Sequence, residues 1–328
     1  MRAKALAAAA VLAGLCAASA LAQPTDTQPP IVVQAEDVEA RANEFVQLVA
    51  LAPSDQLYAR WDERICPSVA GLAPEEAQTL VDHIAMRANE AGLRPGRAGC
   101  QRNVVIIFAP DSDVLAREIV SNRRDLLGVG QDDIQTAGSA ALEEFASTPR
   151  AVRWWHVSYT VTSDGERLRD TGTSAGQGDI NATAALNAAG ENGGSIGGDT
   201  GIVPNTSTAS ITGVEGVRSR GSRLGRSTRR DIGFVLIIVD TRRINGLPPA
   251  AVADYLTMAT LVQLDPNANL AGQPTILNLF APGAAPLEAM TEWDRAFVRG
   301  LYNGPRDSAT ARQQRAAISR EIAEELRE

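Results

Sequence analysis

Apolar positions along this chain occur in two patterns, unbroken runs and helically spaced stripes. Runs without a polar side chain at residues 104–108 and 232–239 predict strands that are buried on both faces. Less regular apolar segments predict three more strands, at residues 31–33, 57–65 and 151–162. Apolar residues spaced three and four apart predict helices over residues 40–50, 74–91, 113–122, 134–147, 249–264, 291–302 and 308–327.

Local signals mark the ends of two of these elements. The Pro-Glu-Glu sequence at residues 74–76 suits the start of a helix, because proline fits the first helical position and acids complement the helix dipole. Gly92 is expected to end this helix. The strand at 57–65 is expected to end at Cys66-Pro67, because proline cannot continue a central ladder.

The order of the elements indicates the fold class. Strands and helices alternate first and helices close the chain, which predicts an α/β or α+β fold with a mixed sheet of about four to five strands, packed helices and C-terminal helices. We expect a single domain over residues 31–328, interrupted by a flexible insertion at 165–230. Within it, ten of the 43 residues from 171 to 213 are glycine, a low-complexity composition that cannot form a packed core.

The N-terminus has the features of a secretory signal peptide over residues 1–22. It combines a positively charged start, an apolar stretch too short to span a bilayer, and small residues at the cleavage positions. Cleavage is expected between Ala22 and Gln23, and the Pro-, Thr- and Gln-rich residues 23–30 are expected to form a disordered leader. No later apolar run approaches membrane length, so the sequence predicts a periplasmic or secreted protein without a transmembrane segment in the mature chain.

The mature chain is acidic and contains no lysine. Removing Arg2 and Lys4 from the 31 basic residues leaves 29 against 39 acidic ones, a formal net charge of −10. This balance argues against a nucleic-acid partner, because phosphate binding needs clustered positive charge. Without lysine there is no phosphate-binding loop of the Walker type, no Schiff base and no serine-lysine dyad. A genome biased towards arginine and alanine codons would produce the same composition.

Two cysteines, Cys66 and Cys100, belong to the predicted mature chain. In an oxidising compartment they are expected to pair. The bridge would close a loop of about 34 residues, worth roughly 3 to 4 kcal/mol in the chain-entropy model. The alternative is two buried free thiols.

The chain has two histidines, His83 and His156, in different predicted elements. A zinc site normally needs three or four protein ligands, and no H-E-x-x-H sequence is present. We therefore expect no metal and no cofactor, and we assign no catalytic residue. His83 lies at the edge of a helical stripe and is interpreted as a surface or packing residue.

A hydrolase that uses carboxylates or His156 is the enzymatic alternative. His156 would serve as a base, but no G-x-S-x-G elbow supplies a nucleophile. Paired carboxylates need only two acids at a defined separation. Asp240, Asp164 and Glu166 follow predicted strands and are candidates by position, although solvated turn residues would look the same.

Two segments are candidates for binding rather than catalysis. Trp154 and Trp155 must point to opposite faces of their strand, so one of them is available for stacking on a ligand. The segment from 218 to 230 is rich in arginine, and this density suits an anionic partner. Its six arginines are Arg218, Arg220, Arg223, Arg226, Arg229 and Arg230. The alternative interpretation of the arginine segment is a solvated hinge that leads into the next strand.

Several short sequences resemble those of an uncharacterised family of exported bacterial proteins. They are Ala59-Arg60-Trp61 before Cys66-Pro67, Cys100 before 104–108, Arg153-Trp154-Trp155, Val239-Asp240, 276–280, and 291–297 continuing to Leu301-Tyr302. More distantly, the order of the elements resembles a zincin metalloprotease. That resemblance implies that the helix at 249–264 takes the place of the zinc-binding helix, yet this helix contains no histidine.

Together these features predict an exported, non-enzymatic protein that binds or supports a component of the cell envelope. The expected partner is an anionic envelope component or an acidic protein.

Overall fold

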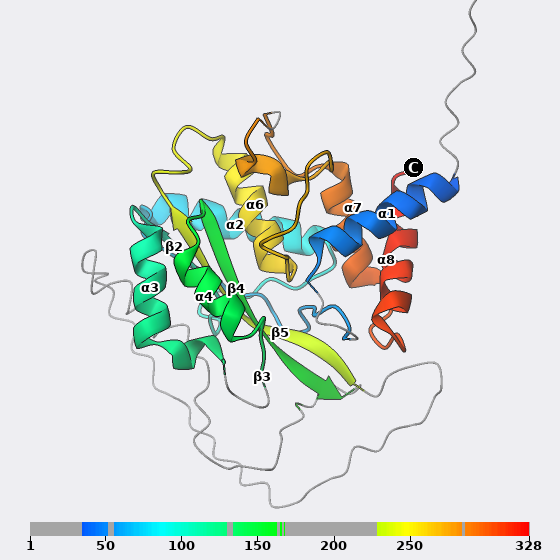
Figure 1. Ribbon diagram of the computed structural model, residues 1–328, viewed down its shortest axis with the longest axis horizontal. Helices are drawn as coiled ribbons and strands as arrows, with labels where there is room; N and C mark the ends of the chain where they lie inside the picture. The colour runs from blue at the N-terminus through cyan, green and yellow to red at the C-terminus, as the bar shows by residue number, and fades with distance from the viewer. Residues whose placement is uncertain are drawn as a thin grey trace, which may run out of the picture. The chain divides into compact units, whose positions relative to one another are not determined.

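The computed structural model describes residues 35–51, 56–129, 134–162, 165, 167, 228–283 and 286–327 (Figure 1). The predicted signal peptide, leader and first strand, together with most of the predicted insertion, lie outside these ranges. No helix within them is both long and apolar enough to cross a bilayer.

Five strands form one mixed sheet. They are β1 (Pro67–Ala70), β2 (Val104–Ala109), β3 (Ile134–Gln135), β4 (Val152–Thr162) and β5 (Thr228–Asp240). Their order across the sheet is β1-β2-β5-β4-β3, with β1, β2 and β5 parallel and with β4 antiparallel to both of its neighbours. The sheet therefore has a parallel half and an antiparallel half, and the expected mixed sheet is confirmed.

Helices cover both faces of this sheet (Figure 1). They are α1 (Ala35–Val49), α2 (Pro74–Glu90), α3 (Ser112–Asn122), α4 (Ser139–Ser147), α6 (Pro249–Leu261), α7 (Glu292–Asn303) and α8 (Ala311–Glu325). On one face, Val105 and Leu236 pack with side chains of α3 and α4. On the other face, Ile106 and Val235 pack with α1, α2, α6 and the C-terminal helices. The side chains of the central strands are buried from both sides, which explains their unbroken apolar sequences.

Two predicted elements differ from the structure. Residues 57–65 were expected to be a strand, but they make only isolated bridges, from Arg60 to Asp231 and from Ile65 to Pro95. The strand begins instead at Pro67, which is tolerated because it is the first residue of an edge strand. The predicted helix at 134–147 is shorter than expected, because its first two residues form β3 and α4 begins only at Ser139.

The disulfide between Cys66 and Cys100 is present, with 6.0 Å between the two Cα atoms. Beside it, the Cys66 amide donates to Oδ1 of Asn103 at 2.8 Å, and the Asn103 amide donates to the Cys66 carbonyl at 3.2 Å. These contacts join the start of β1 to the chain that enters β2. The predicted pairing is confirmed, and it fastens an edge strand to a central strand.

A close approach shapes the antiparallel half of the sheet. The pairing of β4 with β5 shifts register between Val157 and Ser158. Near this bulge the Tyr159 ring lies directly over Gly233, where a Cβ would come within 2.0 Å of Cε2. Glycine is required here because any side chain would collide with the ring.

Candidate functional site

Two of the six arginines of the candidate binding segment lie in the described residues. Arg218, Arg220, Arg223 and Arg226 lie outside them, whereas Arg229 and Arg230 belong to β5, which begins at Thr228 within the predicted insertion range. Arg230 is buried, donating to the Leu57 carbonyl at 3.3 Å and to Oγ of Ser158 at 2.7 Å. Burial lowers the pKa of Arg230 to about 10. The Arg230 guanidinium therefore joins β5 to β4 and to the segment that contains Leu57.

Arg229 has a different environment, because it joins a group of arginines around Asp62. Arg229 Nη2 lies 2.8 Å from Oδ2 of Asp62, Arg306 pairs with Oδ1, and Arg94 Nη2 donates to the Asp62 carbonyl at 3.5 Å. We call these four residues the Asp62 cluster. Burial raises the pKa of Asp62, but the hydrogen bond from Arg306 and the charges of the three arginines outweigh it and lower the pKa.

The Asp62 cluster reaches the surface. The side chains of Arg306 and Asp62 are 43 % and 38 % exposed, and Arg94 is exposed as well. Beneath them, Arg60 is buried and donates to the carbonyls of Leu301 at 2.6 Å and Gly304 at 2.8 Å. Burial, together with the nearby charge of Arg306, lowers the pKa of Arg60 to about 10. Arg229 also donates to Asp231 at 3.0 Å, so four arginines, with Arg60 included, lie near two carboxylates here, although the protein as a whole is acidic.

The two candidate tryptophans lie on opposite faces of β4. Trp155 is buried, donates from Nε1 to the Leu127 carbonyl at 2.9 Å and packs edge-on against Phe145. Trp154 is half-buried on the other face, where Nε1 donates to the Leu264 carbonyl at 3.2 Å. Of the two, Trp154 is the more exposed.

Trp154 lines a pocket that lies between α4, the first half of β4 and the chain after α6. The cavity has a volume of about 40 Å³ and opens to solvent. Its walls are Leu51, Ala137, Ala141, Glu144, Phe145, Arg150, Arg153, Trp154, Trp155, His156, Gln263, Leu264 and Pro266. Arg153, His156 and Gln263 are each no more than 5 % exposed, yet Nε, Nε2 and Oε1 respectively have no hydrogen-bond partner.

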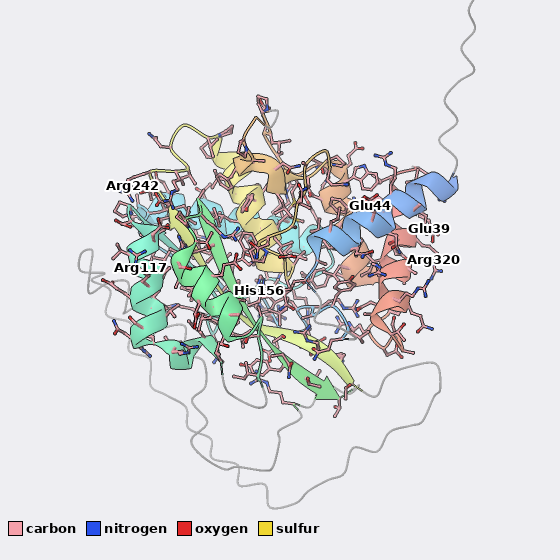
Figure 2. The ribbon with its side chains drawn as sticks, viewed as in Figure 1. Glu39, Glu44, Arg117, His156, Arg242 and Arg320 are labelled. Atoms are coloured by element: carbon pink, nitrogen blue, oxygen red, sulfur yellow. A yellow bond between two sulfur atoms is a disulfide. The ribbon has the colours of Figure 1, made fainter. Side chains whose placement is uncertain are left out.

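His156, labelled in Figure 2, projects from β4 into the protein. Burial lowers its pKa to about 3, although a hydrogen bond to the Ala259 carbonyl acts in the opposite direction. The imidazole is therefore neutral at physiological pH. General acid–base catalysis works best when the pKa lies near the operating pH, so His156 is poorly suited to it.

The candidate carboxylates do not assemble a catalytic pair in the described residues. Asp164 and Glu166 lie outside these residues. Asp240 is fully buried and accepts hydrogen bonds from Oγ of Ser112 at 3.2 Å and from the amides of Arg242 at 3.0 Å and Arg243 at 3.2 Å. The two amide contacts close the turn after β5 and the Ser112 contact joins that turn to α3, so Asp240 has a structural role.

A further group of charged residues joins α2 to α6. Asp254, fully buried in α6, lies 2.6 Å from Nε2 of His83, and Arg87 donates to its two oxygens at 2.9 and 3.0 Å. The Met290 amide completes the set at 2.6 Å. Burial would raise the pKa of Asp254, but these hydrogen bonds lower it to about 2. The Asp254 carboxylate therefore joins three segments, which are α6, α2 and the chain that precedes α7.

We next compared the chain with known proteins. No family model, curated protein or solved structure matches it. The resemblances to an uncharacterised exported family and to a zincin scaffold therefore stay predictions. Within the described ranges no three His, Cys, Asp or Glu side chains gather as a metal site, and α6 presents Asp254 but no histidine.

Sequence reasoning missed both the Asp62 cluster and the link through Asp254. Asp254 is the one charged residue of α6, which is a signal for a buried ion pair. His83 and Arg87, one turn apart on α2, are the matching signal. The partners are 171 and 167 positions away, so the sequence alone does not bring them together.

Proposed function

We propose that this chain is an exported, non-enzymatic protein that binds an anionic component of the cell envelope. The observation that carries the proposal is the Asp62 cluster, in which Arg229 and Arg306 pair with the Asp62 carboxylate and Arg94 donates to the Asp62 backbone carbonyl, at the surface of an acidic protein. Guanidinium groups bind phosphates and carboxylates through paired hydrogen bonds. The N-terminal sequence pattern and the Cys66–Cys100 bridge support export.

The position of the cluster favours a polymeric or multivalent anion. Arg229 is the second residue of β5, and the four arginines at 218–226 precede that strand directly in the chain. An extended anion bound at Arg94 and Arg306 would therefore have further arginines within a short length of chain. The negative charge of the remaining protein would disfavour binding elsewhere, because like charges repel.

The hydrolase alternative has less support. Its proposed base, His156, is buried with a pKa of about 3, and Asp240 is occupied by hydrogen bonds within the protein. His156 is therefore not poised to exchange protons with a substrate near neutral pH.

Binding to the cluster can be tested with a matched pair of double variants. Arg94→Gln with Arg306→Gln changes the cluster, whereas Arg117→Gln with Arg320→Gln removes two exposed arginines from α3 and α8 (Figure 2). The probes are long-chain polyphosphate, phosphatidylglycerol vesicles and a poly-glutamate peptide, which distinguish phosphate polymers, lipid headgroups and acidic protein. We expect the cluster variant to lose about tenfold in affinity for at least one probe at 0.15 M salt.

The control variant should retain wild-type affinity for that probe. Equal losses in both variants would mean that binding follows net charge alone. A wild-type protein that binds none of the three probes would refute the proposal. Export is tested separately by N-terminal sequencing of the periplasmic protein, which should begin at Gln23.

A further inference from the structure

We infer that the pocket beside β4 is an open strand edge, which pairs through its main chain with a short, extended and uncharged peptide segment of a partner. The inference is independent of the Asp62 cluster, because it rests on different residues and on a different kind of contact. Four consecutive residues of β4, at 153–156, line the pocket. Successive side chains of a strand point to opposite faces, so what these four residues share is the edge of the strand.

The first half of β4 has a strand on one side only. β5 pairs with β4 from residue 152 to residue 162, whereas β3 pairs with the other side only at Ser158 and Tyr159. After Gln135 the chain leaves the sheet and turns into α4 through Gly138, which has a φ of 89°. Residues 152–157 therefore form an edge along which no strand of the described part of the chain lies.

The hydrogen-bond pattern shows which main-chain groups face this edge. The Asp240 amide donates to the Ala151 carbonyl at 2.9 Å, so residues 151, 153 and 155 bond to β5 in this antiparallel pair. The amides and carbonyls of Trp154 and His156 point the other way. Within the described ranges, no other residue forms a hydrogen bond with these four groups. They present two donors and two acceptors at the spacing that a neighbouring strand requires.

Unpaired main-chain groups at such a position favour an added strand. His156 is 5 % exposed and Trp154 is half-buried, and buried amides and carbonyls almost always have a partner. An open edge pairs readily with an extended peptide, because the main chain supplies the hydrogen bonds. The protein already uses pairing this short, since β3 has two residues and Ala50 forms an isolated bridge with Leu264 in the pocket wall.

The walls of the pocket favour an uncharged segment. Arg150 pairs with Glu144 at 2.8 Å, and Arg153 pairs with Asp113, so the charges around the pocket are compensated. The apolar part of the wall includes Leu51, Ala141, Leu264 and Pro266. A charged side chain would find no free counter-ion in this wall.

The size of the pocket limits the side chains of the segment. A water molecule needs about 10 to 15 Å³ by this measure, so about 40 Å³ holds a few waters or small side chains such as those of alanine and serine. Because the pocket opens to solvent, the rest of the peptide would lie along its mouth. Water is the competing occupant, and the experiment must separate it from a peptide main chain.

Two isomeric peptides make that separation. Both are acetylated and amidated hexapeptides of alternating serine and alanine that carry two N-methyl groups. Methylation at positions 2 and 4 leaves one peptide edge intact, whereas methylation at positions 3 and 4 interrupts both edges, because donors on one edge lie two residues apart. We expect the first isomer to bind at least about tenfold more tightly than the second, with a Kd of roughly 1 mM for so small a ligand.

NMR of the protein locates the contact. The first isomer should slow hydrogen exchange of the Trp154 and His156 amides at least about fivefold, whereas the amides of residues 153 and 155, which donate to β5, should change little. Equal affinity of the two isomers, binding of neither, or equal slowing at all four amides would overturn the inference. Slowing that appears with rising protein concentration and no peptide would identify a second copy of the chain as the occupant, and would overturn it as well.

A pair of alanine variants in α4 tests the same pocket. Ala141→Leu extends a side chain from the pocket wall, whereas Ala140→Leu adds the same atoms at an exposed position beside it. Both substitutions keep a strong helix former. We expect Ala141→Leu to weaken binding of the first isomer at least about fivefold, and Ala140→Leu to retain wild-type affinity. If Ala141→Leu binds the peptide as the wild type does, the peptide lies elsewhere and the inference fails.

Discussion

His83 and Asp254 form a 2.6 Å contact between α2 and α6, in which the carboxylate is fully buried and the histidine is partly exposed. Arg87 binds the same carboxylate from the next turn of α2. The two helices are thus joined by charge as well as by apolar packing. Because the Met290 amide also donates to Asp254, the chain that enters α7 is fixed at the same point.

Replacing Asp254 should lower the free energy of unfolding. Asp254→Asn leaves the Arg87 guanidinium without its partner charge and weakens the hydrogen bond from the Met290 amide, and we expect a loss of about 3 kcal/mol in the free energy of unfolding at pH 7. Asp82→Asn, on the exposed side of α2, should change it by less than about 0.5 kcal/mol. Urea denaturation measures both values. Similar values for the two variants would show that the buried link contributes little.

The lowered pKa of Asp254 predicts that the stability of the protein falls in acid. The pKa of this carboxyl is lowered from 3.8 to about 2, so the folded state releases this proton more readily than the unfolded chain does. The resulting stabilisation is complete above about pH 4 and is lost as the pH falls towards 2. Unfolding measured between these values should show a smaller pH dependence in Asp254→Asn than in the wild type.

His156 predicts a pH dependence in a different window. Its pKa is lowered from 6.5 to about 3, so below pH 6.5 the unfolded chain binds a proton that the folded protein does not. Stability should therefore fall by roughly 1 kcal/mol for each unit that the pH drops between about 6 and 4. His156→Gln should abolish this component, whereas His83→Gln should retain it. The measurement is urea denaturation at several pH values, and an unchanged slope in His156→Gln would contradict the prediction.

Gly233 should tolerate no side chain while Tyr159 is present. In Gly233→Ala the new Cβ would collide with the tyrosine ring, and we expect a loss of about 2 kcal/mol. In a Tyr159→Ala background the same substitution should cost little, because the obstructing ring is gone. A double-mutant cycle measures this coupling. Additive effects would show that the two residues do not constrain each other.

The disulfide should contribute substantially to stability. Replacing Cys66 and Cys100 by alanine frees 34 residues of chain in the unfolded state, and we expect a loss of roughly 3 to 4 kcal/mol. Thermal unfolding of oxidised and reduced protein provides a comparison without mutation. Two free thiols found by mass spectrometry in periplasmic protein would contradict the bridge.

Much of the fold is predictable from the sequence where local signals agree. The helix at 74–91 carries a starting proline, acids in the first turn and an apolar stripe, and α2 occupies nearly the same residues. The strands at 104–108 and 232–239 are unbroken apolar runs, which lie in β2 and β5, two inner strands of the sheet. The structure of such segments is predictable because propensity, periodicity and burial all favour the same element.

Other parts depend on contacts that the sequence does not display. β1 has only four residues and begins with proline, so its pairing with β2 decides its conformation more than its composition does. β3 is two residues long and lies just before α4. Its residues therefore fitted the helical pattern that predicted one helix over 134–147. The pocket combines residues from β4 and from the chain after α6, so its unpaired atoms become visible only after folding.

The β4–β5 pairing has a consequence for engineering. Thr162 pairs with Thr228, so the chain leaves the sheet and re-enters it at adjacent positions. The intervening stretch is, in topology, the connection of a single hairpin. Since loop-closure entropy changes only slowly with length, residues 168–227 should be replaceable by a short linker or a foreign domain while the sheet is retained. The hairpin is therefore a natural place for grafting.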